Sequence, residues 1–280
     1  MNKAEMEKRR AEMDRRIEEH LQFLDSDENR IACMPFISEC QRMAEISKMY
    51  TDQYQLLYDK LRAESVRVEY GKGGTIMGHR GYYNPSLTKD LVISNANRGR
   101  LLKRVTASTK PDYKYWFYAD GKLTVVDGYA RDLREDAWPK EIILYQGDKE
   151  IGITFQNEYG IQAVSECIRR DNKLITYILS YGNIYEDGYS QYMREDYRYT
   201  EEGLNTADCY EFLNPKFPGA EMLMDSRYIK PILRHSRYSF THDEEGYLSK
   251  YTTDEYKSTG ERIEYGTPRQ WHDVPLKRKV

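Results

Sequence analysis

Long apolar runs are missing from this 280-residue sequence. A membrane-spanning helix needs roughly 20 consecutive apolar residues, and no stretch approaches that length. The N-terminal residues also lack the apolar core of a signal peptide. We therefore expect a cytoplasmic protein that does not associate with membranes.

Cysteine and histidine are scarce, at four and five residues. The cysteines are widely spaced, and none forms the Cys-x-x-Cys pair of a zinc or redox site. His235 and His242, near the two ends of one predicted strand, are badly placed to bind a common ion. The sequence therefore predicts buried free thiols, no bound metal and no cofactor.

Signs of an active site are equally scarce. No histidine or carboxylate pair has the local spacing of a nucleophile and its base. The glycine-rich stretch Gly71–Gly78 lacks the Gly-Lys-Ser/Thr ending of a phosphate-binding loop, so we interpret it as a connection between strands. These absences favour a protein without enzymatic activity. A nuclease or hydrolase site that only the fold assembles is an alternative.

Neither sign of charge is in large excess, because 43 basic and 46 acidic residues give a net charge of −3. Such a balance creates no overall field toward nucleic acid or anionic membranes. Tyrosine, in contrast, is abundant, with 26 residues. A tyrosine ring can be buried while its hydroxyl stays at a wet edge, which suits a sheet with one face on a core and one face open.

Short aromatic and β-branched runs, separated by turn residues, fill the chain from about Tyr113 to Tyr265. In Tyr113–Tyr129 two such runs flank Asp120-Gly121, a dipeptide that accepts the positive φ angles of a tight hairpin turn. The pattern predicts a long antiparallel meander, with strands at about 101–107, 113–119, 122–129, 141–146, 150–156, 161–169, 173–181, 190–199, 206–212, 236–241, 247–256 and 261–265.

The N-terminal region has helical patterns. Residues 3 to about 24 alternate blocks of opposite charge that can pair at i,i+3 and i,i+4 spacing. Asp25-Ser26-Asp27 offers a break and a cap, and Pro35 lies near the start of a second helix that runs to about Ala63. We expect an α+β protein with an N-terminal helical hairpin in residues 1–65 and an antiparallel β-meander domain in residues 66–280.

One candidate interaction surface is the acidic, tyrosine-rich segment from Tyr185 to Glu202. Tyrosine is enriched at protein–protein contacts, and clustered carboxylates suit a basic partner. The other interpretation is an ordinary polar sheet face with aromatic strand residues. The partner-binding candidates are Tyr185, Glu186, Asp187, Tyr189, Tyr192, Glu195, Asp196, Tyr197 and Tyr199.

A second candidate surface is the basic segment from Arg98 to Lys110, which contains no acidic residue. Its side chains can contact phosphates, and Tyr113, Tyr115 and Trp116 lie nearby to stack on bases. Alternatively, this segment is an edge strand that its charges protect from aggregation. The phosphate-contacting candidates are Arg98, Arg100, Lys103, Arg104 and Lys110.

Several strand and turn motifs carry a resemblance to a known group of proteins: Gly99-Arg-Leu-Leu-Lys-Arg-Val, Phe117-Tyr-Ala-Asp-Gly-Lys-Leu, Gly152-Ile-Thr-Phe and Ile168-Arg-Arg-Asp-Asn-Lys-Leu. The stretch that holds them resembles tyrosine-rich bacterial β-meander proteins, some of which are similar to immunity proteins of polymorphic-toxin loci. Its hairpins also resemble Tyr-Asp repeats, but the Tyr-Asp spacing is too irregular for them.

The resemblance implies a non-enzymatic protein that binds a toxin domain and covers its active surface. It assigns no role to any particular residue. A phage- or defence-related protein that binds nucleic acid through the basic segment is the alternative.

Overall fold

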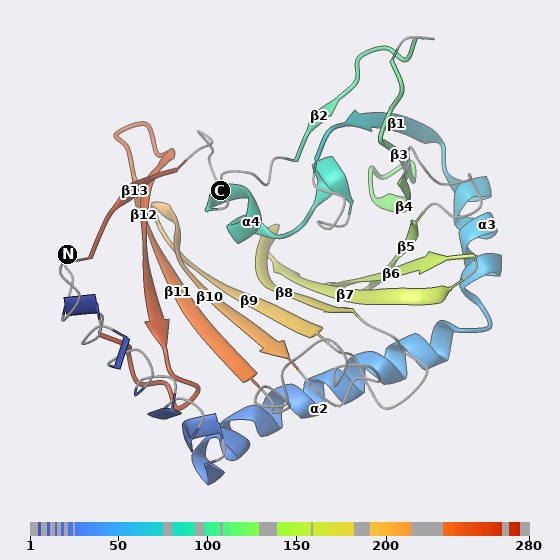
Figure 1. The fold of residues 1–280 in the computed structure, drawn as a ribbon. Coiled ribbons are helices and arrows are strands. Elements are labelled where there is room, and N and C mark those ends of the chain that lie inside the picture. The colour runs from blue at the N-terminus through green and yellow to red at the C-terminus, as the bar shows by residue number, and fades with distance from the viewer. Residues whose placement is uncertain are drawn as a thin grey trace.

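The computed structural model describes residues 26–74, 80–92, 98–106, 109–128, 139–157, 159–181, 191–213, 232–264 and 269–274, with single residues and short runs between 5 and 24. In these residues an N-terminal helical part precedes a 13-stranded antiparallel sheet, which confirms the α+β class. The sheet curves strongly, so that one side is an outer face and the other, inner face encloses a short segment of the chain (Figure 1).

Strand order follows chain order almost throughout the described sheet. From β3 to β13 each strand pairs with the next one along the chain, whereas β1 lies between β3 and β2. The predicted meander is therefore confirmed. The strands are β1 (Arg67–Lys72), β2 (Arg100–Leu101), β3 (Tyr113–Phe117), β4 (Leu123–Gly128), β5 (Lys140–Gln146), β6 (Lys149–Gln156), β7 (Gly160–Arg170), β8 (Lys173–Tyr181), β9 (Gln191–Thr200), β10 (Gly203–Leu213), β11 (Ile232–His242), β12 (Leu248–Tyr256) and β13 (His272–Asp273).

Turn chemistry explains these hairpins. Gly121 has a φ of 84°, as predicted for the β3–β4 turn, and the Asp120 carboxylate accepts a hydrogen bond from the Lys122 N–H at 3.0 Å. Asp171 and Asn172 have φ angles of 51° and 62°. Positive φ at both central residues gives the β7–β8 turn the same twist as its flanking strands.

Two strand predictions near the sheet edges are wrong. Of the predicted strand 101–107, Leu102 is the last residue that is hydrogen-bonded to β1, and residues 103–106 then leave the sheet. Of the predicted strand 261–265, a single β-bridge forms, at Arg262. Both segments have strand-like composition but lack a continuous neighbouring strand to pair with.

The helical region differs from the prediction at the start of the second helix and in a break within that helix. Ser26 caps α2 (Asp27–Tyr50), because its side chain accepts a backbone hydrogen bond from the first turn. Pro35 lies inside α2 rather than near its start. The chain then turns at residues 51–53 before α3 (Tyr54–Glu64), so the predicted second helix is two helices. The described residues between 5 and 24 are helical, as predicted.

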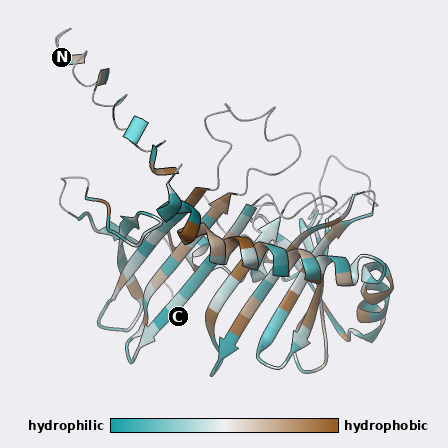
Figure 2. Ribbon diagram, turned by 90° about the horizontal axis from the view of Figure 1, so that it is seen from below, coloured by the Kyte–Doolittle hydropathy of each residue, from teal (hydrophilic) through white to brown (hydrophobic). Residues whose placement is uncertain are grey.

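On the outer face, α2 and α3 share a core with the sheet. Met43 of α2 and Tyr58 of α3 belong to one buried cluster with Ile142 and Phe155 of the strands. Figure 2, which looks at this side, shows α2 lying across one end of the strands, which extend beyond it. The helices and the strands thus follow one another in sequence but bury their apolar side chains together.

The inner face is filled by η2 (Gly81–Tyr83) and α4 (Leu87–Leu91). Leu87 and Leu91 pack with Tyr177 in a second buried cluster, and the aromatic rings of η2 pack on a third around Tyr115. Because helices cover one side and this inner segment the other, every residue of β4 is buried. The sheet therefore has a core on each face, whereas its composition suggested one.

Candidate binding face

A buried ionic network joins the inner segment to the sheet. Arg80 donates hydrogen bonds to Glu141 at 2.8 Å, to Ser165 at 3.2 Å and to Glu150. Burial raises the pKa of Glu141. Burial also opposes ionisation of Glu150, but the charge of Arg80 outweighs it and lowers the pKa of that carboxyl. All four side chains are buried, so the network fixes the inner segment in place.

A second buried network holds the start of α4. Ser86 donates a hydrogen bond to the Glu195 carboxylate at 2.7 Å, and the Tyr197 hydroxyl donates to the same carboxylate. The Leu87 N–H in turn donates to the Tyr197 oxygen at 2.9 Å. Glu195 and Tyr197 therefore contact the interior of their own chain.

The outer face of β9–β12 is polar where these strands extend beyond α2. Side chains alternate between the two faces along a strand, and paired residues of neighbouring strands point to the same face. The strand pairing therefore places one set of charged and aromatic residues together. Residues after β12 reach the same place. We call this set the outer polar face: Arg194, Asp196, Arg198, Asp208, Tyr210, His235, Arg237, Asp254, Tyr256, Arg262 and Arg269.

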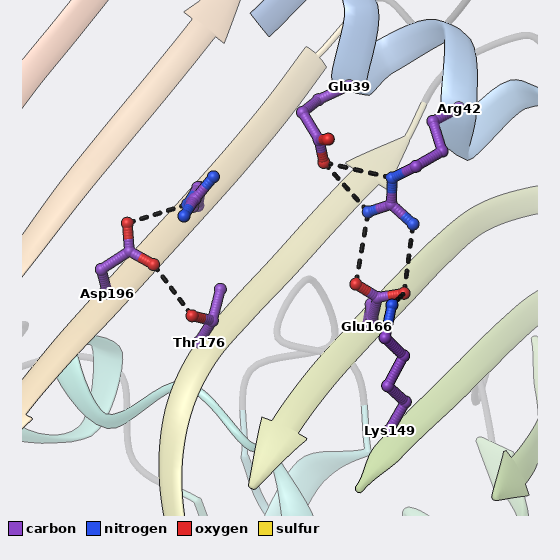
Figure 3. Close-up of polar contacts among 7 residues, drawn as sticks. Glu39, Arg42, Lys149, Glu166, Thr176 and Asp196 are labelled. Atoms are coloured by element: carbon purple, nitrogen blue, oxygen red, sulfur yellow. Dashed lines mark hydrogen bonds and ion pairs between the residues drawn. The ribbon is translucent and has the colours of Figure 1, made fainter. Parts of the chain in front are cut away.

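Ion pairs next to the outer polar face connect α2 to β7 and β6. Arg42 lies between Glu39 and Glu166, with nitrogen–oxygen distances of 2.9 Å and 3.1 Å (Figure 3). Lys149 approaches Glu166 at 3.5 Å from the neighbouring strand. Glu166 is buried, and Arg42 and Lys149 are partly exposed above it. These ion pairs fix the position of α2 relative to β7.

Asp208 is the centre of the outer polar face. Its buried carboxylate lies 2.7 Å from Arg237 Nε, 2.9 Å from His235 Nε2 and 3.1 Å from Arg198 Nη2. Burial opposes ionisation, but the hydrogen bonds from His235 and Arg237 and the nearby positive charges lower the pKa of Asp208 to about 2. Asp208 is therefore ionised at neutral pH and fixes three side chains.

Aromatic stacking fixes one of these side chains further. The His235 ring stacks between the rings of Tyr210 and Tyr256, at centroid distances of 4.3 Å and 4.7 Å. Arg237 lies over the Tyr256 ring, with 5.3 Å from its guanidinium carbon to the centroid. These planar contacts leave the side chains of the face little rotational freedom.

Asp254 repeats the arrangement on β12, two strands away from Asp208. Arg262 Nη2 lies 2.8 Å from Asp254 Oδ1, and Arg269 Nε lies 2.9 Å from the same oxygen. On β9, Asp196 pairs with Arg194 at 2.8 Å and accepts a hydrogen bond from Thr176 at 2.9 Å (Figure 3). Each aspartate of the outer polar face thus orients at least one arginine.

We expect Asp208→Asn to lower the free energy of unfolding at pH 7 by about 2 kcal/mol, because one pKa unit corresponds to about 1.4 kcal/mol. The folded pKa is depressed from an ordinary value of 3.8 to about 2. The contribution is therefore present above about pH 4 and lost as the pH falls toward about 2.

Urea unfolding of the wild-type protein and of Asp208→Asn at several pH values tests this expectation. Asp59→Asn, at an exposed position on α3, is the control. A difference between wild type and Asp208→Asn that does not shrink on acidification would contradict the assignment of a low pKa.

The predicted acidic, tyrosine-rich surface does not form one face. Tyr185, Glu186, Asp187 and Tyr189 lie outside the described residues. The remaining candidates divide between the two sides of the sheet, because neighbouring residues in a strand point in opposite directions. Buried Tyr192 and partly exposed Asp196 are on the outer side, whereas buried Glu195 and Tyr197 and partly buried Tyr199 are on the inner side.

The predicted basic segment is mostly at the surface. Arg100 is exposed on the edge strand β2, and Lys103, Arg104 and Lys110 are exposed in the chain that follows it outside the strands. Arg98 is partly buried, and its guanidinium approaches the Tyr82 carbonyl oxygen at 3.4 Å. The structure therefore places one of the five candidates on an edge strand and three in the exposed chain that follows it.

Sequence reasoning missed most of the outer polar face. The available signal was charge at every second residue, as in Arg194-x-Asp196-x-Arg198 and His235-x-Arg237, which indicates one face of a strand. The partners of Asp208 come from β9 and β11, so only the strand register brings them together.

Among the described residues, no group of three or more His, Cys, Asp and Glu side chains is placed to hold a metal ion. In the same part of the chain, no helix is both long and apolar enough to cross a membrane. Cys33, Cys40 and Cys167 are buried free thiols, as predicted, and Cys209 is partly buried.

In comparisons with known proteins, no family model, curated protein or solved structure matches this chain.

Proposed function

We propose that this chain is a protein-binding protein that uses the outer polar face, and that it serves as a cytoplasmic immunity protein against a bacterial toxin domain. The binding proposal rests on the observation that the arginines of this face are held in fixed positions and are exposed. Buried Asp208 and Asp254 hold them in place while their outer surfaces remain exposed. The resemblance to immunity proteins supplies the class of partner.

Fixed arginines favour association for an entropic reason. Ordering a flexible side chain at an interface costs about 0.5–1.5 kcal/mol, and a side chain already held by its own protein avoids much of that cost. Arginine and tyrosine are also enriched among the residues that dominate binding energy. The outer polar face combines both residue types on a rigid sheet.

Co-expression with the product of the adjacent gene tests the proposal. We expect the wild-type protein to restore growth of cells that produce the toxin encoded by the adjacent gene, and to co-elute with that toxin in size-exclusion chromatography. Arg198→Ala should weaken the complex by roughly tenfold or more, as is typical of an interface hot spot. Arg30→Ala, on an exposed ion pair of α2, is the control. Absence of both rescue and co-elution with the wild-type protein would overturn the proposal.

Nucleic-acid binding is a second candidate function, favoured by the exposure of Arg100 on the edge strand β2 and of Lys103, Arg104 and Lys110 in the chain that follows it. Phosphate contacts of this kind weaken steeply with salt. Fluorescence anisotropy with labelled single-stranded and duplex DNA measures this dependence. Binding that persists when all four residues are changed to glutamine would exclude this segment as the site.

A further inference from the structure

Asp208 holds more positive charge than it can neutralise. One carboxylate, 1% exposed, is paired with two arginines and with His235. Arg237 is 32% exposed and Arg198 is 62% exposed, so the surplus charge faces outward. The surface above this buried carboxylate is therefore positively charged rather than negatively charged.

Asp254 shows the same imbalance. This aspartate is 3% exposed and pairs with both Arg262 and Arg269, which are 43% and 49% exposed. Arg194 and Asp196 neutralise each other on β9. Five arginines therefore oppose three aspartates across the outer polar face, which leaves a net charge of +2 before any charge on His235.

This positive face belongs to a chain whose net charge is −3. The rest of the chain therefore carries a net negative charge, and the outer polar face is the part of β9–β12 whose charge suits an anionic partner. Complementary potentials speed the encounter of two proteins and select their relative orientation.

Negative groups within and beside the face decide between two kinds of anionic partner. Asp196 is 26% exposed beside Arg194, and Glu39 is 31% exposed beside Arg42. A continuous run of phosphates would meet these carboxylates as well as the arginines. Separate carboxylates of a protein segment can pair with the arginines and leave Asp196 and Glu39 facing neutral or basic groups.

We infer that the outer polar face binds an acidic segment of a protein, whose Asp and Glu carboxylates pair with the exposed surfaces of Arg198, Arg237, Arg262 and Arg269. This inference rests on the proposed function and names the chemistry of its partner. It also reverses the expectation from sequence, in which an acidic surface of this chain takes a basic partner.

The strand arrangement offers a variant that removes only the surplus charge. In the double variant R198Q/R269Q, Asp208 keeps Arg237 and Asp254 keeps Arg262, so neither buried carboxylate is left without a cation. The control is K60Q/K122Q, which removes the same charge from exposed ion pairs elsewhere, at side chains 63% and 52% exposed. Thermal unfolding verifies that each variant is folded.

The probes are a short fluorescein-labelled peptide rich in Asp and Glu, a lysine peptide of the same length, and a labelled DNA duplex. We expect the acidic peptide to bind and the lysine peptide not to bind. R198Q/R269Q should weaken acidic-peptide binding by roughly tenfold, whereas K60Q/K122Q should change it by less than about twofold. For the wild type, raising the salt concentration should weaken binding, which tests the charge without any variant.

Three results would overturn the inference: preference for the lysine peptide, equal loss of binding in both double variants, or DNA binding as tight as that of the acidic peptide and lost in R198Q/R269Q. The same double variant, tested in the toxin co-elution assay, separates the two proposals. An intact complex with R198Q/R269Q would overturn the acidic-segment inference while leaving the immunity function standing. Failure of wild-type co-elution would overturn the function itself.

Discussion

Replacing Arg80 with methionine is expected to lower the free energy of unfolding at neutral pH by about 3–5 kcal/mol, the usual cost of removing one partner from a buried ion pair. Arg80 is 2% exposed and pairs with both Glu141 and Glu150. Methionine keeps the apolar contacts of the first part of the side chain and removes the charge with its hydrogen bonds. Its backbone meets the same constraint at a φ of 62°, so the backbone angle does not account for the difference.

The pH dependence of the Arg80→Met variant provides a second readout. Without the arginine, burial dominates at both Glu141 and Glu150 and raises each folded pKa above the unfolded value of about 4.3. Such groups stabilise the fold below the unfolded pKa and lose that contribution as the pH rises. The variant should therefore regain stability relative to the wild type when the pH is lowered from about 8 to about 5.

Urea denaturation followed by circular dichroism measures both effects. The triple variant Arg80→Met, Glu141→Gln, Glu150→Gln should recover much of the loss, because it removes the buried charges together. Arg30→Met, at an exposed ion pair, should cost less than about 1 kcal/mol. If Arg80→Met cost no more than Arg30→Met, the inner network would not support the fold.

Gly152→Ala is expected to destabilise the protein by about 3 kcal/mol, through overpacking and displacement of the same ion pairs. A Cβ atom at Gly152 would lie closer than 3.0 Å to side-chain atoms of Glu141, Ser165 and Arg80. These atoms belong to buried groups whose positions are fixed by hydrogen bonds. The glycine is thus required for space, not for a special backbone angle.

A double-mutant cycle distinguishes this cause from a general weakness of β6. In the Arg80→Ala background one of the three clashing atoms is gone, and Glu141 and Ser165 are no longer held by Arg80 and can move away, so Gly152→Ala should cost at least about 1 kcal/mol less than in the wild type. Gly121→Ala is a useful comparison, because its Cβ would meet nothing within 4 Å and only its φ of 84° opposes the change. Additive costs of Arg80→Ala and Gly152→Ala would contradict the steric explanation.

The meander could be predicted because its signals are local. Each hairpin needs two short strands and a turn, and the turn residues Gly121, Asp171 and Asn172 specify positive φ by their own chemistry. Helix boundaries were harder to predict. Pro35 is tolerated within α2, and the break at residues 51–53 has no proline or glycine to announce it.

The polar sites could not be predicted in the same way, because they depend on contacts between distant parts of the chain. Arg80 reaches carboxylates 61 and 70 residues away, and Arg42 reaches Glu166 across 124 residues. Adjacent Glu195 and Asp196 read as one acidic patch in the sequence, but Glu195 is buried on the inner side of the sheet and Asp196 is partly exposed on the outer side. Composition could not show that the inner face would be filled by η2 and α4.

Strand order has a consequence for how the protein forms during synthesis. From β3 onward each strand emerges from the ribosome next to the strand that it will pair with, so the sheet can grow one hairpin at a time. Helix α2 is made early, whereas Glu166, the carboxylate that anchors Arg42, follows 124 residues later. The apolar side of α2 therefore stays uncovered while the first strands form, and it is fully covered only after Tyr192 of β9 and Phe212 of β10 have been translated.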